Sequence, residues 1–162
     1  MRYGKINKAD IANGTGVRVS LFVSGCRNRC KGCFNPETWN FEYGQKYTVK
    51  TLDEIIKALD HDYISGLTIL GGDPFEPENL PIVTGLALAV KYFFKNKTVW
   101  VYTGYNYEDF KDHEIMDYID VLVDGRFIEA QKDISLKFRG SKNQRIIDVK
   151  ASRSSGTIKL LD

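Results

Sequence analysis

All three cysteines of this chain lie within eight residues, in the segment Cys26-Arg-Asn-Arg-Cys30-Lys-Gly-Cys33. Their spacing is C-x3-C-x2-C, with Gly32 inside the segment and Gly25 directly before it. A loop this short can turn three sulfurs inward without a ligand from a distant part of the chain. Thiolates are preferred ligands of soft metal centres. The segment therefore predicts one site for such a centre.

The number of cysteines points to the kind of centre. A [4Fe–4S] cluster normally takes four thiolates, one for each iron. Three thiolates leave one iron without a protein ligand, so that iron can hold a small chelating substrate. An electron carrier would be better served by four protein ligands, whereas a catalyst needs an open position. The count of three favours a catalytic cluster.

Other readings of the three cysteines remain open. Structural zinc takes four Cys or His ligands, and neither His61 nor His113 has a ligand-like position relative to the cysteine segment. A disulfide between Cys30 and Cys33 would be strained and would leave one cysteine over. Three unrelated buried thiols are a further alternative. The close spacing favours the cluster over each of these.

Composition limits the classes of partner. The 162 residues fit one domain, and a hydrophobic content of 43% is enough for a core. The net charge of +2, from 23 basic and 21 acidic side chains, is too balanced to indicate nucleic acid or an anionic membrane. There is no run of 18 apolar residues, and the first residues lack the apolar stretch of a signal peptide. We expect a cytoplasmic protein without a membrane or nucleic-acid partner.

The hydrophobic pattern predicts strands alternating with helices. Strands are expected at residues 17–23, 66–70, 98–102, 119–123 and 144–149, and Asn13-Gly14 indicates a hairpin turn before the first of them. Helices are expected from the capping box Thr51-x-x-Glu54 to about Asp60, and again from Pro81. This order predicts an α/β fold with a largely parallel sheet.

Chain length limits how far such a sheet can close. A complete (β/α) barrel needs about 250 residues, so this chain can supply only an open, truncated partial barrel. We expect residues 1–150 to form the single domain. Residues 151–162 lose periodicity and are expected to form a mobile tail.

Two segments beside the cysteines have more than one interpretation. Gly71-Gly72-Asp73-Pro74 follows a strand, and either brings the backbone close to a ligand or makes an ordinary turn capped by Asp73. The basic residues Arg27, Arg29 and Lys31 either stabilise a negatively charged cluster or form a solvated or docking surface.

The cysteine spacing, with Phe34 after the last cysteine, resembles that of the radical S-adenosylmethionine (SAM) superfamily. Further segments extend the likeness over about residues 5 to 149, in this order: Gly14-Thr-Gly16-Val-Arg18, Leu21-Phe-Val-Ser-Gly-Cys26, Cys33-Phe-Asn35, Gly71-Gly-Asp-Pro74, Val99-Trp-Val-Tyr-Thr-Gly-Tyr105, Val121-Leu-Val-Asp-Gly-Arg-Phe127 and Arg139-Gly-Ser-Lys-Asn-Gln144. Together they resemble the activating proteins of anaerobic (class III) ribonucleoside-triphosphate reductases.

This resemblance implies a curved partial barrel and a [4Fe–4S] cluster on Cys26, Cys30 and Cys33. It also implies a SAM site, with the adenine part against Gly32, Cys33 and Phe34 and the methionine part against Gly72. Gly71, Asp73 and Thr103 are expected as further contacts. The chemistry is carried by the cofactors, so we name no catalytic acid, base or nucleophile.

The implied activity is reductive cleavage of SAM, followed by hydrogen abstraction from a glycine of the reductase. The implied partners are the anaerobic reductase and a low-potential electron donor such as a flavodoxin, ferredoxin or thioredoxin system. The alternatives are an activase of another glycyl-radical enzyme, of the formate-lyase type, and a non-enzymatic iron–sulfur or zinc-binding protein. Asp124 is expected either to cap a turn or to orient a substrate.

Overall fold

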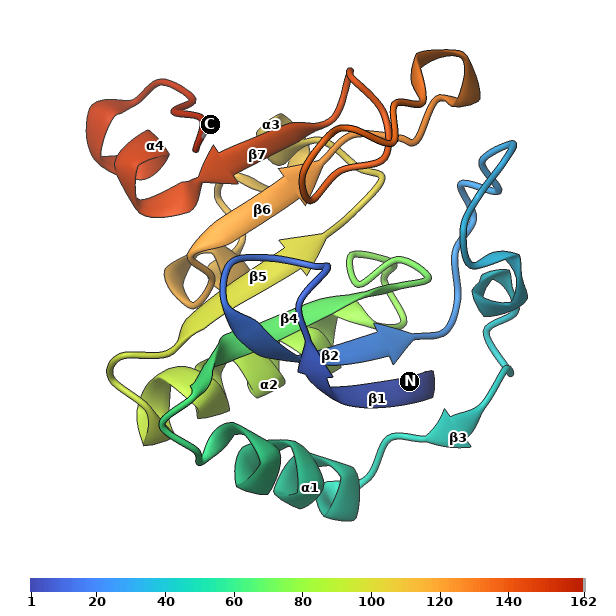
Figure 1. The fold of residues 1–162 in the computed structure, drawn as a ribbon. Coiled ribbons are helices and arrows are strands. Elements are labelled where there is room, and N and C mark those ends of the chain that lie inside the picture. The colour runs from blue at the N-terminus through green and yellow to red at the C-terminus, as the bar shows by residue number, and fades with distance from the viewer. Residues whose placement is uncertain (162) are drawn as a thin grey trace.

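One open seven-stranded sheet carries the rest of the molecule (Figure 1). The computed structural model describes residues 1–161. The strands are β1 Arg2–Asp10, β2 Val17–Val23, β3 Gln45–Lys46, β4 Ile64–Gly71, β5 Thr98–Tyr102, β6 Val121–Asp124 and β7 Arg145–Asp148. They lie in the order β3-β1-β2-β4-β5-β6-β7. The predicted α/β class is confirmed.

The sheet is mixed. Strands β2, β4, β5 and β6 pair in parallel, whereas β1, β3 and β7 join antiparallel at the two edges. The expectation of a largely parallel sheet therefore describes the four central strands alone. The predicted turn at Asn13-Gly14 lies in the loop that connects β1 to β2, and the sequence pattern did not reveal β1 itself.

The α-helices are α1 Val49–Leu59, α2 Leu80–Phe93, α3 Tyr107–Phe110 and α4 Val149–Ser155, with 3-10 turns at Pro36–Trp39, Glu114–Asp117 and Glu129–Gln131. Helices α1 and α2 lie on the same side of the sheet (Figure 1). Within residues 1–161, no helix has both the length and the apolar character needed to cross a membrane.

Alternation along β2 gives the sheet two different faces. Val19, Leu21 and Val23 belong to the main core, together with buried side chains of α1 and α2. Phe22 lies on the other face and lines a pocket, together with Leu70 of β4 and Tyr102 of β5. One face of the sheet thus packs against the core, and on the other face β2, β4 and β5 contribute residues to a ligand-sized pocket.

A fully buried arginine holds the pocket face together at the start of the parallel strands. The Arg18 guanidinium donates hydrogen bonds to Thr68 Oγ1 (2.8 Å), Thr98 Oγ1 (3.0 Å) and the carbonyl of Leu67 (2.9 Å). It also lies 5.5 Å from the ring centre of Trp100. Burial lowers the pKa of Arg18 to about 10, so the guanidinium remains charged at neutral pH. This one side chain connects β2, β4 and β5.

Two local predictions are corrected by the structure. Helix α1 is capped by Thr48 with Thr51 as its reciprocal partner, so the capping box lies three residues before the predicted one. The expected loss of regular structure after residue 150 is wrong for residues 151–155, which belong to α4. Asp148 caps that helix by accepting a hydrogen bond from the Ala151 N–H (2.9 Å). Mobility of the tail stays a prediction.

We expect Arg18→Ala to lower the free energy of unfolding by about 3 kcal/mol, because it leaves buried acceptors unpaired and opens a cavity. Urea denaturation of the metal-free protein measures the loss. The matched control is Arg153→Ala, which removes an exposed pair with Asp117 (2.7 Å) and should cost less than about 1 kcal/mol. Equal costs for the two variants would contradict the role assigned to Arg18.

Candidate functional site

The cysteine segment follows β2 at the carboxyl edge of the parallel strands and opens onto a pocket of about 550 Å³. Eight of the nine residues predicted for the site line this pocket: Cys26, Cys30, Cys33, Phe34, Gly71, Gly72, Asp73 and Thr103. Gly32 does not line it. The fold therefore gathers residues from three separate strand ends around the cysteines, as parallel α/β sheets do at their functional edge.

The three cysteines are free thiols and are partly buried. Among residues 1–161, no three Cys, His, Asp or Glu side chains are grouped closely enough to hold a single metal ion. A [4Fe–4S] cluster binds each thiolate through a different iron, so its ligands need not converge on one point. Three unpaired thiols facing one pocket fit such a cluster, whereas four ligands prearranged for structural zinc are not found in this part of the chain.

Burial raises the pKa of the Cys26 thiol to about 11. Without metal, this thiol is therefore neutral at pH 7. Metals bind cysteine as the thiolate, so a metal bound through Cys26 would displace this proton.

The backbone fixes where the cysteine loop leaves the sheet. Gly25 has a φ of +104°, a conformation that suits glycine, and its N–H donates to the carbonyl of Thr38 (2.7 Å). The Cys26 N–H donates to the carbonyl of Trp39 (3.2 Å). Trp39 itself lines the pocket.

The glycine pair at the end of β4 packs directly against this loop. The Gly72 N–H donates to the carbonyl of Val23 (2.7 Å), and the Asp73 N–H donates to the carbonyl of Gly25 (2.8 Å). A Cβ atom on Gly72 would lie 2.7 Å from the Gly25 oxygen, which is too close. Gly72 therefore has a packing role, in addition to its place in the pocket lining.

Asp73 is a buried junction between β4, β5 and the cysteine loop. Its carboxylate accepts hydrogen bonds from Thr103 Oγ1 (2.7 Å), the Gly104 N–H (2.9 Å) and Asn28 Nδ2 (2.9 Å). Burial raises the pKa of Asp73 to about 6, against the opposing effect of these donors. Because Thr103 donates to Asp73 and accepts from the Tyr105 N–H (3.1 Å), its hydroxyl has little capacity left for an adenosyl group.

A second buried carboxylate, Glu76, was not predicted from the sequence. It accepts hydrogen bonds from the Arg27 backbone N–H and from the Tyr105 hydroxyl (2.7 Å), and it pairs with the Arg27 guanidinium (3.3 Å). Its side chain is fully buried. Glu76 comes just after Asp73-Pro74, but its partners lie far away in sequence, so only the folded structure reveals this anchor for the cysteine loop.

Asp124 also has a structural role. It is completely buried, accepts from the Tyr107 N–H (2.8 Å) and receives a hydrogen bond from Arg145 Nε (2.9 Å). Arg145 extends the network to Glu108 (2.9 Å). The carboxylate therefore ties β6 to β7 and to α3. Of the two expected roles, the structure supports the turn-stabilising one.

The segment between β6 and β7 forms an unpredicted wall of the pocket. Phe127, Lys132, Ile134, Leu136, Phe138 and Arg139 all line it. The Phe127 ring packs against Phe34 with ring centres 5.2 Å apart, which joins this wall to the end of the cysteine segment. The apolar residues in 128–143 are separated by polar ones and follow no strand or helix period, so the sequence alone does not predict these contacts.

Comparison with known proteins agrees with the geometry of this site. Residues 12–147 match the family described as a 4Fe-4S single cluster domain. The anaerobic ribonucleoside-triphosphate reductase-activating protein of Enterobacteria phage T4 is 43% identical over 148 residues, covering 90% of this chain and 93% of the relative. The chain belongs to this family of activating proteins.

Bacterial members of the family are equally similar. The Vibrio cholerae activating protein is 44% identical over 150 residues, covering 90% of this chain and 97% of the relative. The Escherichia coli K12 activating protein is 40% identical over 148 residues, covering 89% and 96%. Residues 12–147, which match the family model, include the cysteine loop, both buried carboxylates and the β6–β7 wall.

We expect Glu76→Ala to lower the free energy of unfolding by about 2–4 kcal/mol and to reduce iron retention, because two buried donors lose their acceptor. Urea denaturation and iron analysis after anaerobic reconstitution measure these effects. Glu78→Ala is the matched control, since Glu78 pairs with the same Arg27 (2.6 Å) but is 44% exposed. It should cost far less stability than Glu76→Ala, because exposed ion pairs contribute little. Equal iron loss in both variants would contradict the anchoring role of Glu76.

Proposed function

We propose that this chain activates an anaerobic ribonucleoside-triphosphate reductase by radical SAM chemistry. The observation that carries the proposal is the set of three free thiols on one pocket, in a chain whose relatives bear the activating-protein name. Cys26, Cys30 and Cys33 would hold a [4Fe–4S] cluster. When bound, the cluster and SAM supply a reductively generated 5′-deoxyadenosyl radical that takes a hydrogen atom from a glycine of the reductase.

The protein's own contribution is to bind, orient and shield these groups. Cys33 and Phe34 would contact the adenine part, and Gly72 the methionine part. The apolar lining from Phe22, Leu70 and Phe138 would keep water away from the reacting atoms. No side chain needs to transfer a proton in this scheme.

The open sheet suits a protein substrate. We infer that the curved sheet is part of a (β/α) barrel whose missing strands leave one side accessible. A loop of another protein is too large to be enclosed by a complete barrel wall, so an incomplete wall gives it access to the pocket. The exposed side chains of Phe34 (61%) and Ile134 (93%) at the pocket would contact such a loop. We place this activity in the cytoplasm, with a low-potential electron donor.

We expect Cys30→Ala to lose the cluster and with it all cleavage of SAM, because an iron loses its thiolate. The reconstituted native protein should be brown and oxygen-sensitive, with about four irons per chain. Iron and sulfide analysis and an anaerobic assay for 5′-deoxyadenosine measure both properties. Lys57→Ala, on α1, is the control and should match the native protein. SAM cleavage by Cys30→Ala at the native rate would overturn the proposal.

Electron paramagnetic resonance separates the alternatives. With the class III reductase as partner, a glycyl radical should appear on the reductase. Its appearance only with a formate-lyase-type enzyme would favour that alternative. A protein that binds iron or zinc without cleaving SAM on reduction would be a non-enzymatic metal protein.

A further inference from the structure

Residues 132–141 of the β6–β7 wall form a short hairpin-like segment, which we call the strap. At its base, Lys132 and Ser141 make an isolated antiparallel bridge, and the Lys142 N–H donates to the carbonyl of Gln131 (3.0 Å) just outside it. Ser141 is completely buried. Most of the strap beyond this base lines the pocket. The strap is therefore fixed at its base and covers part of the site.

The outer part of the strap has no polar connection to the sheet. Among residues 1–161, the hydrogen bonds of residues 133–139 all have their partners within residues 133–144. The contact with the sheet is apolar: the Phe138 ring lies edge-on to the Trp100 ring, with ring centres 5.5 Å apart. Apolar contacts have no fixed direction. The outer part can thus move about its base without breaking a hydrogen bond to the sheet.

The packed position of the strap contains two unfavourable features. Phe138 has a φ of +64°, a left-handed conformation that a bulky side chain rarely adopts. Tyr102 packs on the same apolar cluster as Phe138 and lines the pocket, and its buried hydroxyl has no hydrogen-bond partner within residues 1–161. A buried hydroxyl without a partner is destabilising. Both features reduce the advantage of the packed position over a displaced one.

Both arms of the strap lie beside Phe34 of the cysteine segment. A Cβ atom on Gly140 would lie 2.8 Å from the Phe34 ring and 3.1 Å from the Phe127 ring, so a larger residue would force the rings or the strap to shift. On the other arm, the Lys132 ammonium lies 5.4 Å from the Phe34 ring centre. The strap therefore contacts the residue that the proposed function places against the adenine part of SAM.

We propose that the strap is a lid that opens to admit SAM and closes over it, with the contact between Gly140 and Phe34 coupling the ligand to the lid. This inference rests on the proposed function, because it takes SAM as the ligand beside Phe34. A ligand in the pocket gains contacts with the strap only in the closed position, so it shifts the equilibrium toward closure. Closure then excludes water from the pocket.

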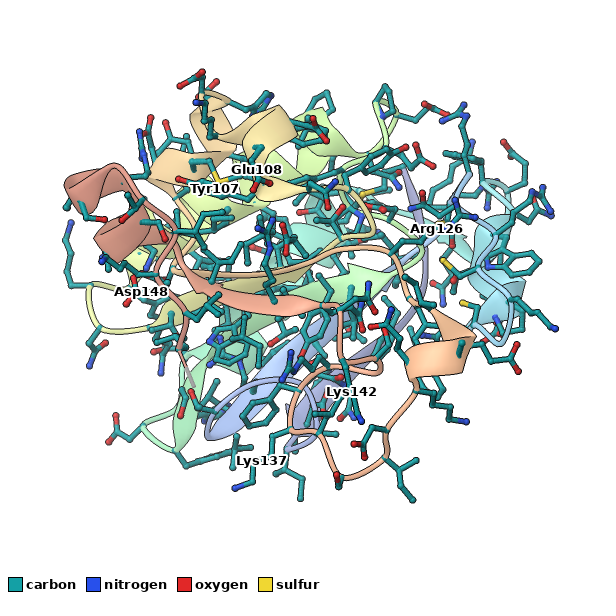
Figure 2. All side chains as sticks on the ribbon, turned by 90° about the horizontal axis from the view of Figure 1, so that it is seen from above. Tyr107, Glu108, Arg126, Lys137, Lys142 and Asp148 are labelled. Carbon is teal, nitrogen blue, oxygen red and sulfur yellow. The ribbon has the colours of Figure 1, made fainter. Side chains whose placement is uncertain are left out.

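Tryptic cleavage after Lys137 measures the opening. Lys137 is an exposed residue of the strap that does not line the pocket, so a ligand does not shield it by direct contact. Figure 2 shows it at the periphery of the molecule, well separated from Arg126. In the anaerobically reconstituted protein, SAM should slow this cleavage about tenfold, because proteolysis follows the population of the open form. Cleavage after Lys95, in the exposed loop between α2 and β5, is the internal control and should not change. Mass spectrometry identifies each cut.

Two variants test the coupling, and equilibrium dialysis measures their SAM binding. Gly140→Ala should push the strap off the cysteine segment and weaken SAM binding about fivefold, because apparent affinity falls with the fraction of molecules that can close. Phe138→Ala removes the apolar contact with the sheet and should speed cleavage after Lys137 in the absence of SAM. Gly85→Ala is the matched glycine control, since a Cβ atom there would meet open space on α2. It should match the native protein in both measurements.

The outcomes separate the lid from the proposed function. Equal cleavage after Lys137 with and without SAM, while dialysis shows SAM bound, would overturn the lid and leave the proposed function standing. Native-like cleavage and binding in both Gly140→Ala and Phe138→Ala would also reject the lid. Absence of SAM binding by the native protein is a different result, which would count against the proposed function and against the lid that depends on it.

Discussion

The site depends on a backbone contact between two strand ends. The carbonyl of Val23 accepts from Gly72, the carbonyl of Gly25 accepts from Asp73, and the Gly25 N–H donates to Thr38. No side chain fits between these segments, as the 2.7 Å approach at Gly72 shows. The path of the cysteine loop is therefore set by main-chain atoms. Asp73 and Glu76 then hold the loop by accepting hydrogen bonds from Asn28 Nδ2 and from the Arg27 backbone N–H.

Local features of the site could be predicted from the sequence. The cysteine spacing, the glycine pair after β4 and the Asn-Gly turn each depend only on a few neighbouring residues, so they can be recognised without the fold. The central strands are recognisable because burial on both faces leaves a continuous apolar run, as in β4. Eight of the nine residues expected from the cysteine spacing and the family resemblance line one pocket.

Other features depend on contacts between distant segments and could not be predicted. In the sequence, Glu76 looks like any acidic residue near a helix. Its hydrogen bonds with Arg27 and Tyr105 form only when folding places these distant residues beside it. The sequence predicted a ligand contact for Thr103, but it did not reveal that the Thr103 hydroxyl donates a hydrogen bond to Asp73. Helix α4 is too short to show a periodic apolar stripe, and its Asp148 cap also belongs to β7.

Arg18 also has a consequence for the division of labour within the sheet. Its guanidinium and the Trp100 ring lie at the start of the parallel strands, whereas the cysteine loop follows their carboxyl ends, and Arg18 is fully buried there. Neither residue is among those that line the pocket. The groups that hold the central strands together are therefore separate from the groups that could contact a ligand, so each set can vary without directly altering the other.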